Sequence, residues 1–365
     1  RLDLLEDSFH SIVNRHEILR TLIQEDAEGQ GYQLVMDDKE YPLIINKKAV
    51  GSRAALDEEI RKEANHIYDL GKEYPIRVCI LELANDTLIS EYYLSLVIHH
   101  IAFDGWSFDI LLKELREYYT YYLARSKREE ASLDLPLLSI QYKDFALWQR
   151  HYMSGEKLKE QLRYWKEKLE GYEPLILVAD KPRPKQINYA GADVFFEVDE
   201  ETSTGLRVLA REVGVSLYSV LLSAYYLMLK VYSNQNDIIV GSLAANRHYY
   251  QIENLIGFFV NTLALRVQIN SKINIEQFIE QVGKEVLTAQ LHQELPFAKL
   301  VEDLNVSKDT SRHSIFQVMF GVQRFDNELM TIRDKQKTPL STLFQVYKPE
   351  KSIYNVAKFD LSTFF

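Results

Sequence analysis

The stretch from Tyr92 to Tyr122 constrains the fold of this chain more than any other feature of the sequence. An apolar, aromatic and β-branched run of strand length, Tyr92 to Ile98, leads directly into His-His-Ile-Ala-Phe-Asp-Gly at positions 99–105. Apolar residues then recur at helical spacing, at Trp106, Ile110, Leu111, Leu115, Tyr118, Tyr119 and Tyr122. The pattern predicts a strand, a short loop and a helix. Because loops at strand ends often carry function, we expect the chemistry of this protein at the two histidines.

These two histidines are expected to have different roles. Adjacent residues on an extended backbone point to opposite faces, so one of His99 and His100 should face packed protein and the other a cavity. A histidine can accept a proton near neutral pH, and backbone groups beside it select the free nitrogen. Gly105 is expected to let the backbone turn or a ligand approach closely. The alternative is a pair of core histidines with Asp104 as an ordinary helix N-cap.

Six segments of the sequence carry a family resemblance. The pattern HHxxxDG resembles the signature of chloramphenicol acetyltransferase-like acyltransferases, and its continuation into Trp106 and Ser107 resembles the condensation domains of nonribosomal peptide synthetases. The segments that resemble condensation-domain motifs, in family order, are RHEILRT at 15–21, HHIAFDG at 99–105, YKDFALW at 142–148, IGFFVNTLALR at 256–266, HQELPFAKLVE at 292–302 and SRHSIFQVMF at 311–320. Glu294, Ser314 and Ile315 replace the aspartate, proline and leucine of the family motifs.

The resemblance assigns the catalytic role to His100. This imidazole would take a proton from an attacking amine, or would orient that amine and stabilise the tetrahedral intermediate, and the sequence leaves both open. His99 is expected to be an internal hydrogen-bonding residue, and Gly105 to keep a phosphopantetheine path open. In the family the first arginine of RHExLRT pairs with the aspartate of HHxxxDG. Arg15 is therefore expected to bind Asp104 through two hydrogen bonds and to brace the histidine loop.

Six further residues are candidates for lining a tunnel or contacting substrate. Asn261 and Thr262 are polar residues inside an apolar, strand-like segment, and buried polar groups need partners. The other four candidates lie in or directly after the family motifs and are Trp106, Ser107, Ser314 and Gln317. No metal site is predicted.

The fold that the resemblance implies is α/β, with two chloramphenicol acetyltransferase-like lobes in a V-shaped pseudo-dimer and an active-site tunnel at their interface. Two prolines within a charged run interrupt regular structure at 179–193, which predicts a linker there. The expected lobes are residues 1–178, with the start missing, and residues 194–365, with the end missing. The second lobe is expected to open with a strand at Val194–Val198.

Composition excludes several other classes of protein. The chain has 365 residues, 46% of them hydrophobic and 12% aromatic, which is enough for two buried cores. A net charge of −10 argues against a nucleic-acid surface. The single cysteine, Cys79, excludes internal disulfides and cysteine-based metal sites. Without a signal peptide or an apolar run of membrane length, we expect a cytoplasmic location and no membrane contact.

The function implied by the resemblance is peptide-bond formation in nonribosomal peptide synthesis. An acceptor aminoacyl thioester would attack a donor aminoacyl or peptidyl thioester, both carried on phosphopantetheine arms. The expected partners are an upstream donor and a downstream acceptor peptidyl carrier domain, with an adenylation domain as neighbour in the same polypeptide. No cofactor is expected to bind directly, because 4'-phosphopantetheine arrives on the carriers. The strings DGWS and RHEILRT resemble domains that accept an L-configured donor, the LCL subtype.

Three alternatives stay open at the level of sequence. An epimerisation domain also keeps HHxxxDG, although the Trp106-Ser107 continuation favours condensation. A catalytically inactive module that recruits a carrier or another partner is the second alternative, and a stand-alone acyltransferase that uses coenzyme A is the third. The sequence shows no carrier-type serine motif and no adenylation signature, so other domains would have to activate and carry the substrates.

Overall fold

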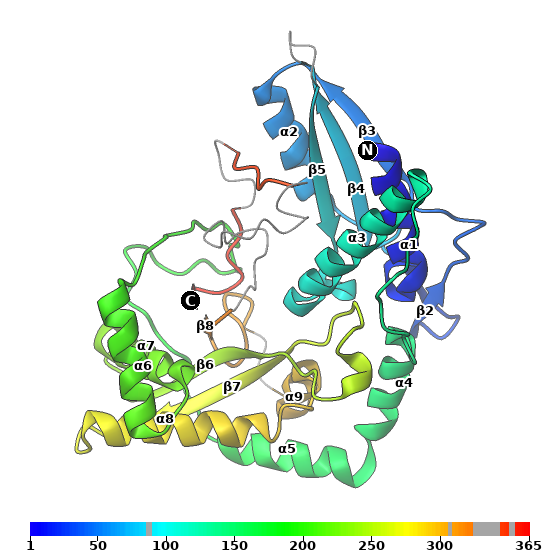
Figure 1. Cartoon of the computed structure of the whole chain (residues 1–365). Helices are drawn as coiled ribbons and strands as arrows, with labels where there is room; N and C mark the ends of the chain where they lie inside the picture. The colour runs from blue at the N-terminus through cyan, green and yellow to red at the C-terminus, as the bar shows by residue number, and fades with distance from the viewer. Residues whose placement is uncertain (85–89, 306–308, 324–343, 350–354) are drawn as a thin grey trace. The chain divides into compact units, whose positions relative to one another are not determined.

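The computed structural model describes residues 1–84, 90–305, 309–323, 344–349 and 355–365 (Figure 1). Helices alternate with strands along the described chain, and the strands form sheets with both parallel and antiparallel pairs. The predicted α/β class is therefore confirmed. The described residues form two compact units. Unit 1 holds residues 1–84, 90–149, 247–259 and 344–349. Unit 2 holds residues 150–246, 260–305, 309–323 and 355–365.

Unit 1 is built around the sheet β3-β4-β5, in which β3 and β4 are parallel and β4 and β5 antiparallel. Its elements are α1 (Leu2–Arg15), η1 (Glu17–Arg20), β1 (Thr21–Glu25), β2 (Gly31–Val35), β3 (Ile45–Val50), α2 (Arg53–Ala64), β4 (Ile76–Leu83), β5 (Glu91–Ile98), η2 (His100–Ala102), α3 (Gly105–Ser126), α4 (Tyr142–Tyr152), which continues into unit 2, and η3 (Tyr250–Ile252). The predicted strand, loop and helix are confirmed as β5, η2 with its flanking residues, and α3.

Successive side chains of strand β4 point to opposite faces of the sheet, and an apolar cluster on each face buries them. Val78 and Ile80 belong to the apolar cluster of α1 and α3, whereas Cys79 and Leu81 belong to that of α2. Figure 1 shows α2 on one side of this sheet and α1 with α3 on the other. Full burial of a valine, isoleucine or leucine side chain stabilises the folded state by about 1.5–3 kcal/mol. The sheet is therefore a firm support for the loop that follows β5.

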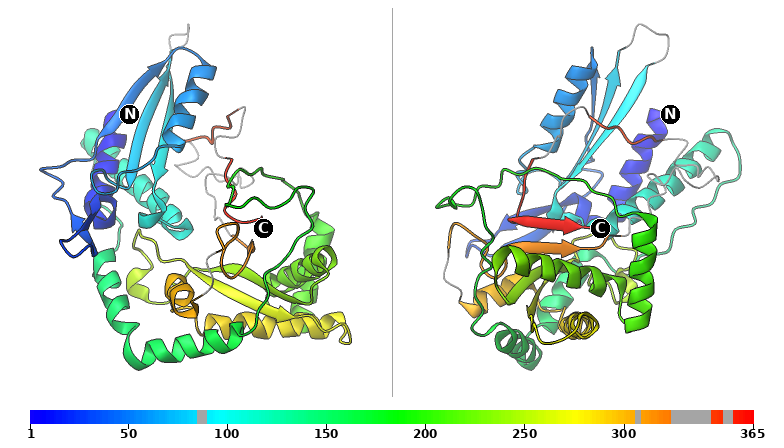
Figure 2. Two further views of the ribbon diagram at one scale, coloured as in Figure 1. Left: turned by 180° about the vertical axis from the view of Figure 1, so that it is seen from behind. Right: turned by 90° about the vertical axis from the view of Figure 1, so that its left-hand side faces the viewer.

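Unit 2 is built around the sheet β7-β6-β8-β9. Its further elements are α5 (Gly155–Leu169), α6 (Glu200–Val213), α7 (Leu217–Ser233), β6 (Asp237–Ala244), β7 (Asn261–Gln268), α8 (Ile275–Gln290), α9 (Phe297–Leu304), β8 (Val318–Gly321) and β9 (Leu361–Phe364). β6 and β7 are antiparallel, and β8 joins β6 and β9 through parallel pairs. Figure 2 shows β8 and β9 side by side and running in the same direction.

Helices α7 and α8 pack against the sheet of unit 2 and against each other. Tyr226 of α7 is completely buried, and its hydroxyl donates to the carbonyl oxygen of Leu265 in β7 at 2.7 Å. Burial raises the pKa of this phenol well above its usual value, so it stays a hydrogen-bond donor at any ordinary pH. Trp165 of α5 is also buried in this core, and its indole N–H donates to the carbonyl oxygen of His292.

The two compact units differ from the predicted lobes 1–178 and 194–365. Helix α5 belongs to unit 2, because Trp165 and Leu169 are buried in the same apolar cluster as β6 and β7. Residues 247–259 belong to unit 1, although the prediction placed them in the second lobe. The chain therefore passes between the units several times, which hydrophobic periodicity along the sequence does not reveal.

The segment 179–193 is not a free linker. The backbone N–H of Ile187 donates to Thr310 at 2.8 Å, and that of Gly191 donates to Asn355 at 3.1 Å. Arg183 forms an ion pair with Asp360. The prolines do keep this segment out of regular helix and strand, but its backbone is tied to other parts of unit 2.

Residues Val194–Val198 do not form the predicted strand. Val194 is 85% exposed and Phe195 is 92% exposed. In the part of the chain that the structure describes, this segment has no strand partner. Apolar and β-branched residues favour a strand only where another strand pairs with it, and that condition is not written in the local sequence.

No single helix among the described residues has both the length and the apolar character needed to cross a membrane. Only when α6 and α7 are counted together, across a bend of 105°, do they meet that criterion by length and composition.

Candidate active site

The turn between β5 and α3 sets the two histidines apart. His100 is exposed, and its Nδ1 lies 2.5 Å from the carbonyl oxygen of Phe103. Because a carbonyl oxygen only accepts hydrogen bonds, Nδ1 is the donor of this contact, and in the neutral imidazole Nε2 then keeps its lone pair. His100 can therefore accept a proton from a molecule that approaches Nε2.

His99 faces protein, as the alternation along the strand predicts. Its ring packs edge-on against Tyr68, with 5.5 Å between the ring centroids. Its Nδ1 accepts the backbone N–H of Ile101 at 3.1 Å, which caps η2. The two histidines thus have different surroundings, and the alternative of two core histidines is wrong for His100, which is exposed. Their different roles stay a prediction.

Asp104 forms a buried ion pair with Arg247. The Nη2 of Arg247 lies 3.0 Å from Oδ1 of Asp104, and the two side chains are 1% and 3% exposed. Asp104 also accepts the backbone N–H groups of Ser107, as the N-cap of α3, and of Phe259. Nη1 of Arg247 donates to two backbone carbonyls of its own segment, those of Ile252 and Leu255. Burial lowers the pKa of the Arg247 guanidinium, and the nearby Asp104 offsets this lowering only in part. Nη1 and Nη2 of Arg247 are hydrogen-bonded, whereas its Nε has no hydrogen-bond partner among the described residues.

The predicted pair between Arg15 and Asp104 is wrong. Nε of Arg15 donates to Oε1 of Glu114 in α3 at 2.8 Å, and its guanidinium also reaches the carbonyl oxygen of Pro136. Helices α1 and α3 pack side by side, and Glu114 lies ten residues beyond Asp104, or roughly 15 Å along a helix axis. Arg15 at the end of α1 is therefore beside Glu114. The brace for the histidine loop comes from Arg247.

Ser107 lies at the centre of this polar cluster and is completely buried. Its hydroxyl is 2.8 Å from Oδ1 of Asp104 and 2.9 Å from Nη2 of Arg247, and it accepts the N–H of Gly257 at 3.1 Å. The prediction that Ser107 lines a substrate path is therefore wrong. Its hydroxyl oxygen provides a hydrogen-bond partner for the buried polar groups of Asp104, Arg247 and Gly257.

The segment 256–259 lies directly against the histidine loop. A Cβ on Gly257 would come within 2.3 Å of the Tyr142 ring, so only glycine fits. The Tyr142 hydroxyl donates to the carbonyl oxygen of Phe258 at 2.9 Å. Burial, with a smaller effect of Asp104, raises the pKa of Tyr142 to about 12, so the phenol remains a donor. The Phe258 ring in turn packs against His100, 5.0 Å between centroids.

Comparison with known proteins identifies the family of the chain. A family model described as the Condensation domain matches residues 1–363. The chain belongs to the condensation domain family. This condensation domain is 37% identical over 358 residues to an N-(5-amino-5-carboxypentanoyl)-L-cysteinyl-D-valine synthase of Amycolatopsis lactamdurans, covering 98% of the chain and 9% of that relative. It is 35% identical over 363 residues to malpibaldin synthetase of Mortierella alpina, covering 99% of the chain and 6% of the relative.

A solved structure of similar fold is the condensation domain from Monacolin K polyketide synthase MokA. The TM-score is 0.75 at 19% identity, covering 90% of this chain and 74% of the other. The α/β fold is thus that of solved condensation domains. The chain spans only 9% and 6% of the lengths of the two curated relatives above.

Two further predicted site residues of this condensation domain, Gly105 and Trp106, lie at the start of α3, next to the histidine loop. Trp106 is half exposed, and its indole N–H donates to the carbonyl oxygen of Glu253 at 3.1 Å, so it holds segment 247–259 against α3. Gly105 begins α3 with a backbone angle that any residue adopts, so the predicted turn is not its reason. A Cβ there would meet no described atom within 4 Å. The other prediction, that a glycine at position 105 lets a ligand approach closely, stays a prediction.

The side-chain amides of two candidates in unit 2, Asn261 and Gln317, are hydrogen-bonded to main-chain groups. The amide of Asn261 donates to the carbonyl oxygens of Gln293 and Leu295 and accepts the N–H of Phe297, so it holds that turn. Gln317 is 1% exposed, and its amide accepts from the Leu175 N–H and donates to the carbonyl oxygen of His313. Gln317 is buried, so its predicted place on a substrate path is wrong, whereas Asn261 is partly exposed and its predicted contact with substrate stays a prediction.

The remaining candidates, Thr262 and Ser314, are partly exposed. Thr262 pairs in register with Leu243 across β6 and β7. The carbonyl oxygen of Ser314 accepts the Tyr172 hydroxyl at 2.6 Å. Their predicted contact with substrate stays a prediction.

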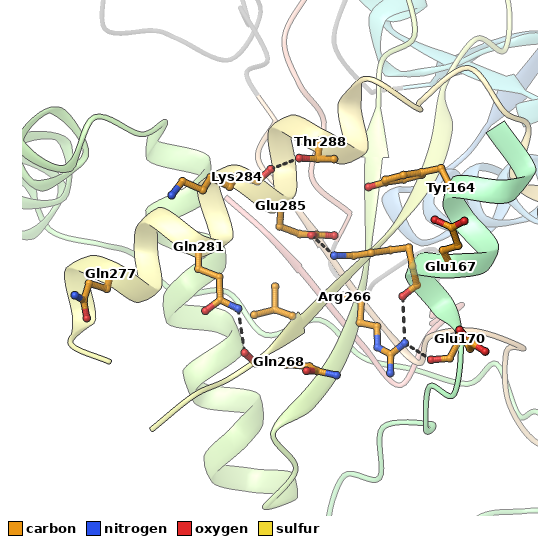
Figure 3. A pocket seen from close by; sticks show the side chains of 12 residues that line it. Tyr164, Glu167, Glu170, Arg266, Gln268, Gln277, Gln281, Lys284, Glu285 and Thr288 are labelled. Atoms are coloured by element: carbon orange, nitrogen blue, oxygen red, sulfur yellow. Dashed lines mark hydrogen bonds and ion pairs between the residues drawn. The ribbon is translucent and has the colours of Figure 1, made fainter. Parts of the chain in front are cut away.

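Unit 2 of the condensation domain also has a polar groove of about 720 Å³ between α5, β7 and α8 (Figure 3). Lys168 and Glu285 form an ion pair there, Arg266 donates to the carbonyl oxygen of Glu170, and Gln281 donates to that of Gln268. Burial raises the pKa of the Glu285 carboxyl, and Lys168 lowers it. The groove contains none of the predicted site residues, and its main charges already pair with one another.

Three residues of the site are not predicted by the sequence: Arg247, Glu114 and Phe258. Arg247 lies close to the motif at 256–266, but the sequence does not show that this arginine is buried. The sequence does not say which carboxylate it meets. For Phe258 there is no signal, because an aromatic residue beside another is more often part of a core.

Proposed function

We propose that this condensation domain joins a donor aminoacyl or peptidyl thioester to an acceptor aminoacyl thioester, both held on phosphopantetheine arms of carrier domains. The observation that carries this proposal is the contact between Nδ1 of the exposed His100 and the carbonyl oxygen of Phe103, which in the neutral imidazole leaves Nε2 as the acceptor. Asp104 and Arg247 hold the loop that presents it. The relative from Amycolatopsis lactamdurans is named for a peptide product, an L-cysteinyl-D-valine, which supports the same reaction class.

The chemical step balances without a further reactant. The acceptor amine attacks the donor thioester carbonyl, a carbon–nitrogen bond forms and the carbon–sulfur bond breaks. Nε2 of His100 takes the proton from the attacking nitrogen, and that proton leaves with the carrier thiol. General base catalysis of this kind contributes about 10² to 10⁴ in rate. Alignment of the two tethered substrates contributes a further factor.

Several finer proposals follow from the family resemblance. The donor residue is L-configured, as in the LCL subtype. The partners are an upstream donor and a downstream acceptor carrier domain, with an adenylation domain nearby in the same polypeptide. The domain holds no cofactor of its own, and Gly105 leaves space for the incoming phosphopantetheine arm. A cytoplasmic location and a tunnel between the lobes stay predictions.

The test is to mix the domain, in its full polypeptide, with two differently loaded carrier domains and to identify the product by mass. The proposal predicts that the acceptor carrier gains the donor group as a dipeptidyl thioester. An unchanged mass with inverted configuration of the donor residue would indicate epimerisation. Carriers that bind but give no product would indicate a recruiting module, and transfer from acyl-coenzyme A without carriers would indicate a stand-alone acyltransferase.

A further inference from the structure

The aromatic ring of Phe258 packs against the imidazole of His100. The ring centroids are 5.0 Å apart and the ring planes meet at 80°, an edge-to-face arrangement that aromatic pairs favour. The two residues lie far apart in the sequence, and both belong to unit 1. Phe258 is 38% exposed, so its ring is not simply part of a core.

The backbone around Phe258 is held at three successive residues. The N–H of Gly257 donates to the Ser107 hydroxyl, the carbonyl oxygen of Phe258 accepts the Tyr142 hydroxyl, and the N–H of Phe259 donates to Asp104. Tyr142 also leaves no room for a side chain at position 257. The backbone from which the Phe258 ring projects is therefore fixed by the same buried cluster that braces the histidine loop.

The imidazole itself needs a second contact. The hydrogen bond from Nδ1 to the carbonyl oxygen of Phe103 selects the tautomer, but a single hydrogen bond leaves the ring plane free to tilt about that bond. The reactive nitrogen, Nε2, lies on the opposite side of the ring from this anchor. A small tilt therefore moves the lone pair away from an incoming amine, and catalysis depends strongly on such alignment.

We propose that Phe258 is a positioning residue that fixes the plane of the His100 imidazole, so that the Nε2 lone pair points to the attacking amine. This rests on the proposed role of His100 as the group that accepts the proton. Phe258 acts through the histidine, and a ring at position 258 is what the function requires.

The kinetic test replaces Phe258 by leucine and by tyrosine. F258L removes the ring and lowers kcat about 3- to 10-fold, with KM for the loaded carriers unchanged, because an edge-to-face contact is lost. F258Y keeps the ring and keeps kcat within about twofold of wild type. The matched control is Tyr250→Leu, which removes a ring that is 72% exposed in the same segment and leaves kcat unchanged. Because Phe258 is partly exposed, the melting temperature of F258L should fall only slightly.

A spectroscopic test is independent of turnover. With ¹³C-labelled histidine, the His100 ring signal is assigned by its loss in His100→Asn. Removal of the neighbouring ring current in F258L moves this signal, whereas F258Y and Tyr250→Leu leave it in place. A shifted signal together with a lowered kcat supports the proposal. An unmoved signal, or a moved signal with wild-type kcat, overturns it. Full activity of His100→Ala would instead overturn the proposed function, so the two failures are distinguishable.

Discussion

Asp104 joins three separate parts of unit 1 with one carboxylate. It caps α3 through the N–H of Ser107, pairs with Arg247, and accepts the N–H of Phe259. Arg247 adds a cation–π contact to this arrangement, with its guanidinium carbon 4.1 Å from the centre of the Phe259 ring. The aspartate of the histidine loop is therefore a brace. We expect its charge to hold the loop in position.

We predict that Asp104→Asn costs about 3–5 kcal/mol of unfolding free energy, because it leaves the buried Arg247 without its counter-ion. Peptide formation falls as well, since the loop that carries His100 loses its brace. Urea unfolding checks the first effect and single-turnover kinetics the second. The control is Asp3→Asn, which breaks an exposed pair with Arg1 and leaves both measurements unchanged. A stable Asp104→Asn variant with normal turnover would contradict this role.

At the scale of elements, His16 connects α1, α3 and segment 247–259. This histidine is 1% exposed. Its Nε2 lies 2.9 Å from Oε2 of Glu114, and its Nδ1 accepts the backbone N–H of Ile256 at 3.3 Å. A ring that accepts at one nitrogen and donates at the other satisfies both neighbours only in its neutral form. The segment that supplies Arg247 is thus tied to the helix pair.

Two substitutions at His16 separate these contacts. His16→Asn keeps an acceptor for the Ile256 N–H and loses the donor to Glu114, whereas His16→Gln keeps the donor and loses the acceptor. Each loses one buried hydrogen bond, so both should be destabilised by about 1–3 kcal/mol. We expect a larger fall of kcat in His16→Gln, because only that variant releases the segment that carries Arg247 and Phe258. Equal kcat values in the two variants would show that the Ile256 contact does not matter for turnover.

Helix α2 is held to the sheet of unit 1 by an ion-pair cluster at Glu63, which is 4% exposed. Lys48 of β3 and Arg77 of β4 contact its carboxylate oxygens at 3.0 and 2.9 Å. Burial alone raises the pKa of Glu63, but the hydrogen bonds from these cations outweigh it, so the pKa lies below its ordinary value of 4.5. The folded state therefore binds fewer protons than the unfolded state. This contribution to stability is present above pH 4.5 and is lost as the pH falls through the folded pKa.

We predict that Glu63→Gln lowers the unfolding free energy at pH 7 by about 1–3 kcal/mol, because charged hydrogen bonds become neutral ones. The difference between wild type and variant should shrink as the pH falls below 4.5. Urea unfolding from about pH 3 to neutral pH measures both effects. A difference that stays constant over that range would contradict the role of the charge.

At the scale of the whole molecule, the sequence predicts local elements and misses most long-range pairs. The β5, η2 and α3 order follows from residue periodicity and a helix cap, which are local properties. The partner of Asp104 lies 143 residues away, and nothing in the spacing of charges along the chain distinguishes Arg247 from Arg15. Asn261 and Gln317 bind main-chain groups that only the fold brings near, and the sequence does not predict these contacts. The compact units differ from the predicted lobes for the same reason.

In the proposed mechanism, His100 accepts the proton of the attacking amine. The most direct measurement is the single-turnover rate of peptide formation by folded His100→Ala with two loaded carriers, beside a control variant of the exposed His10 in the same unit. We predict that the rate falls about 10²- to 10⁴-fold in His100→Ala and does not change in His10→Ala. A wild-type rate in folded His100→Ala would contradict it.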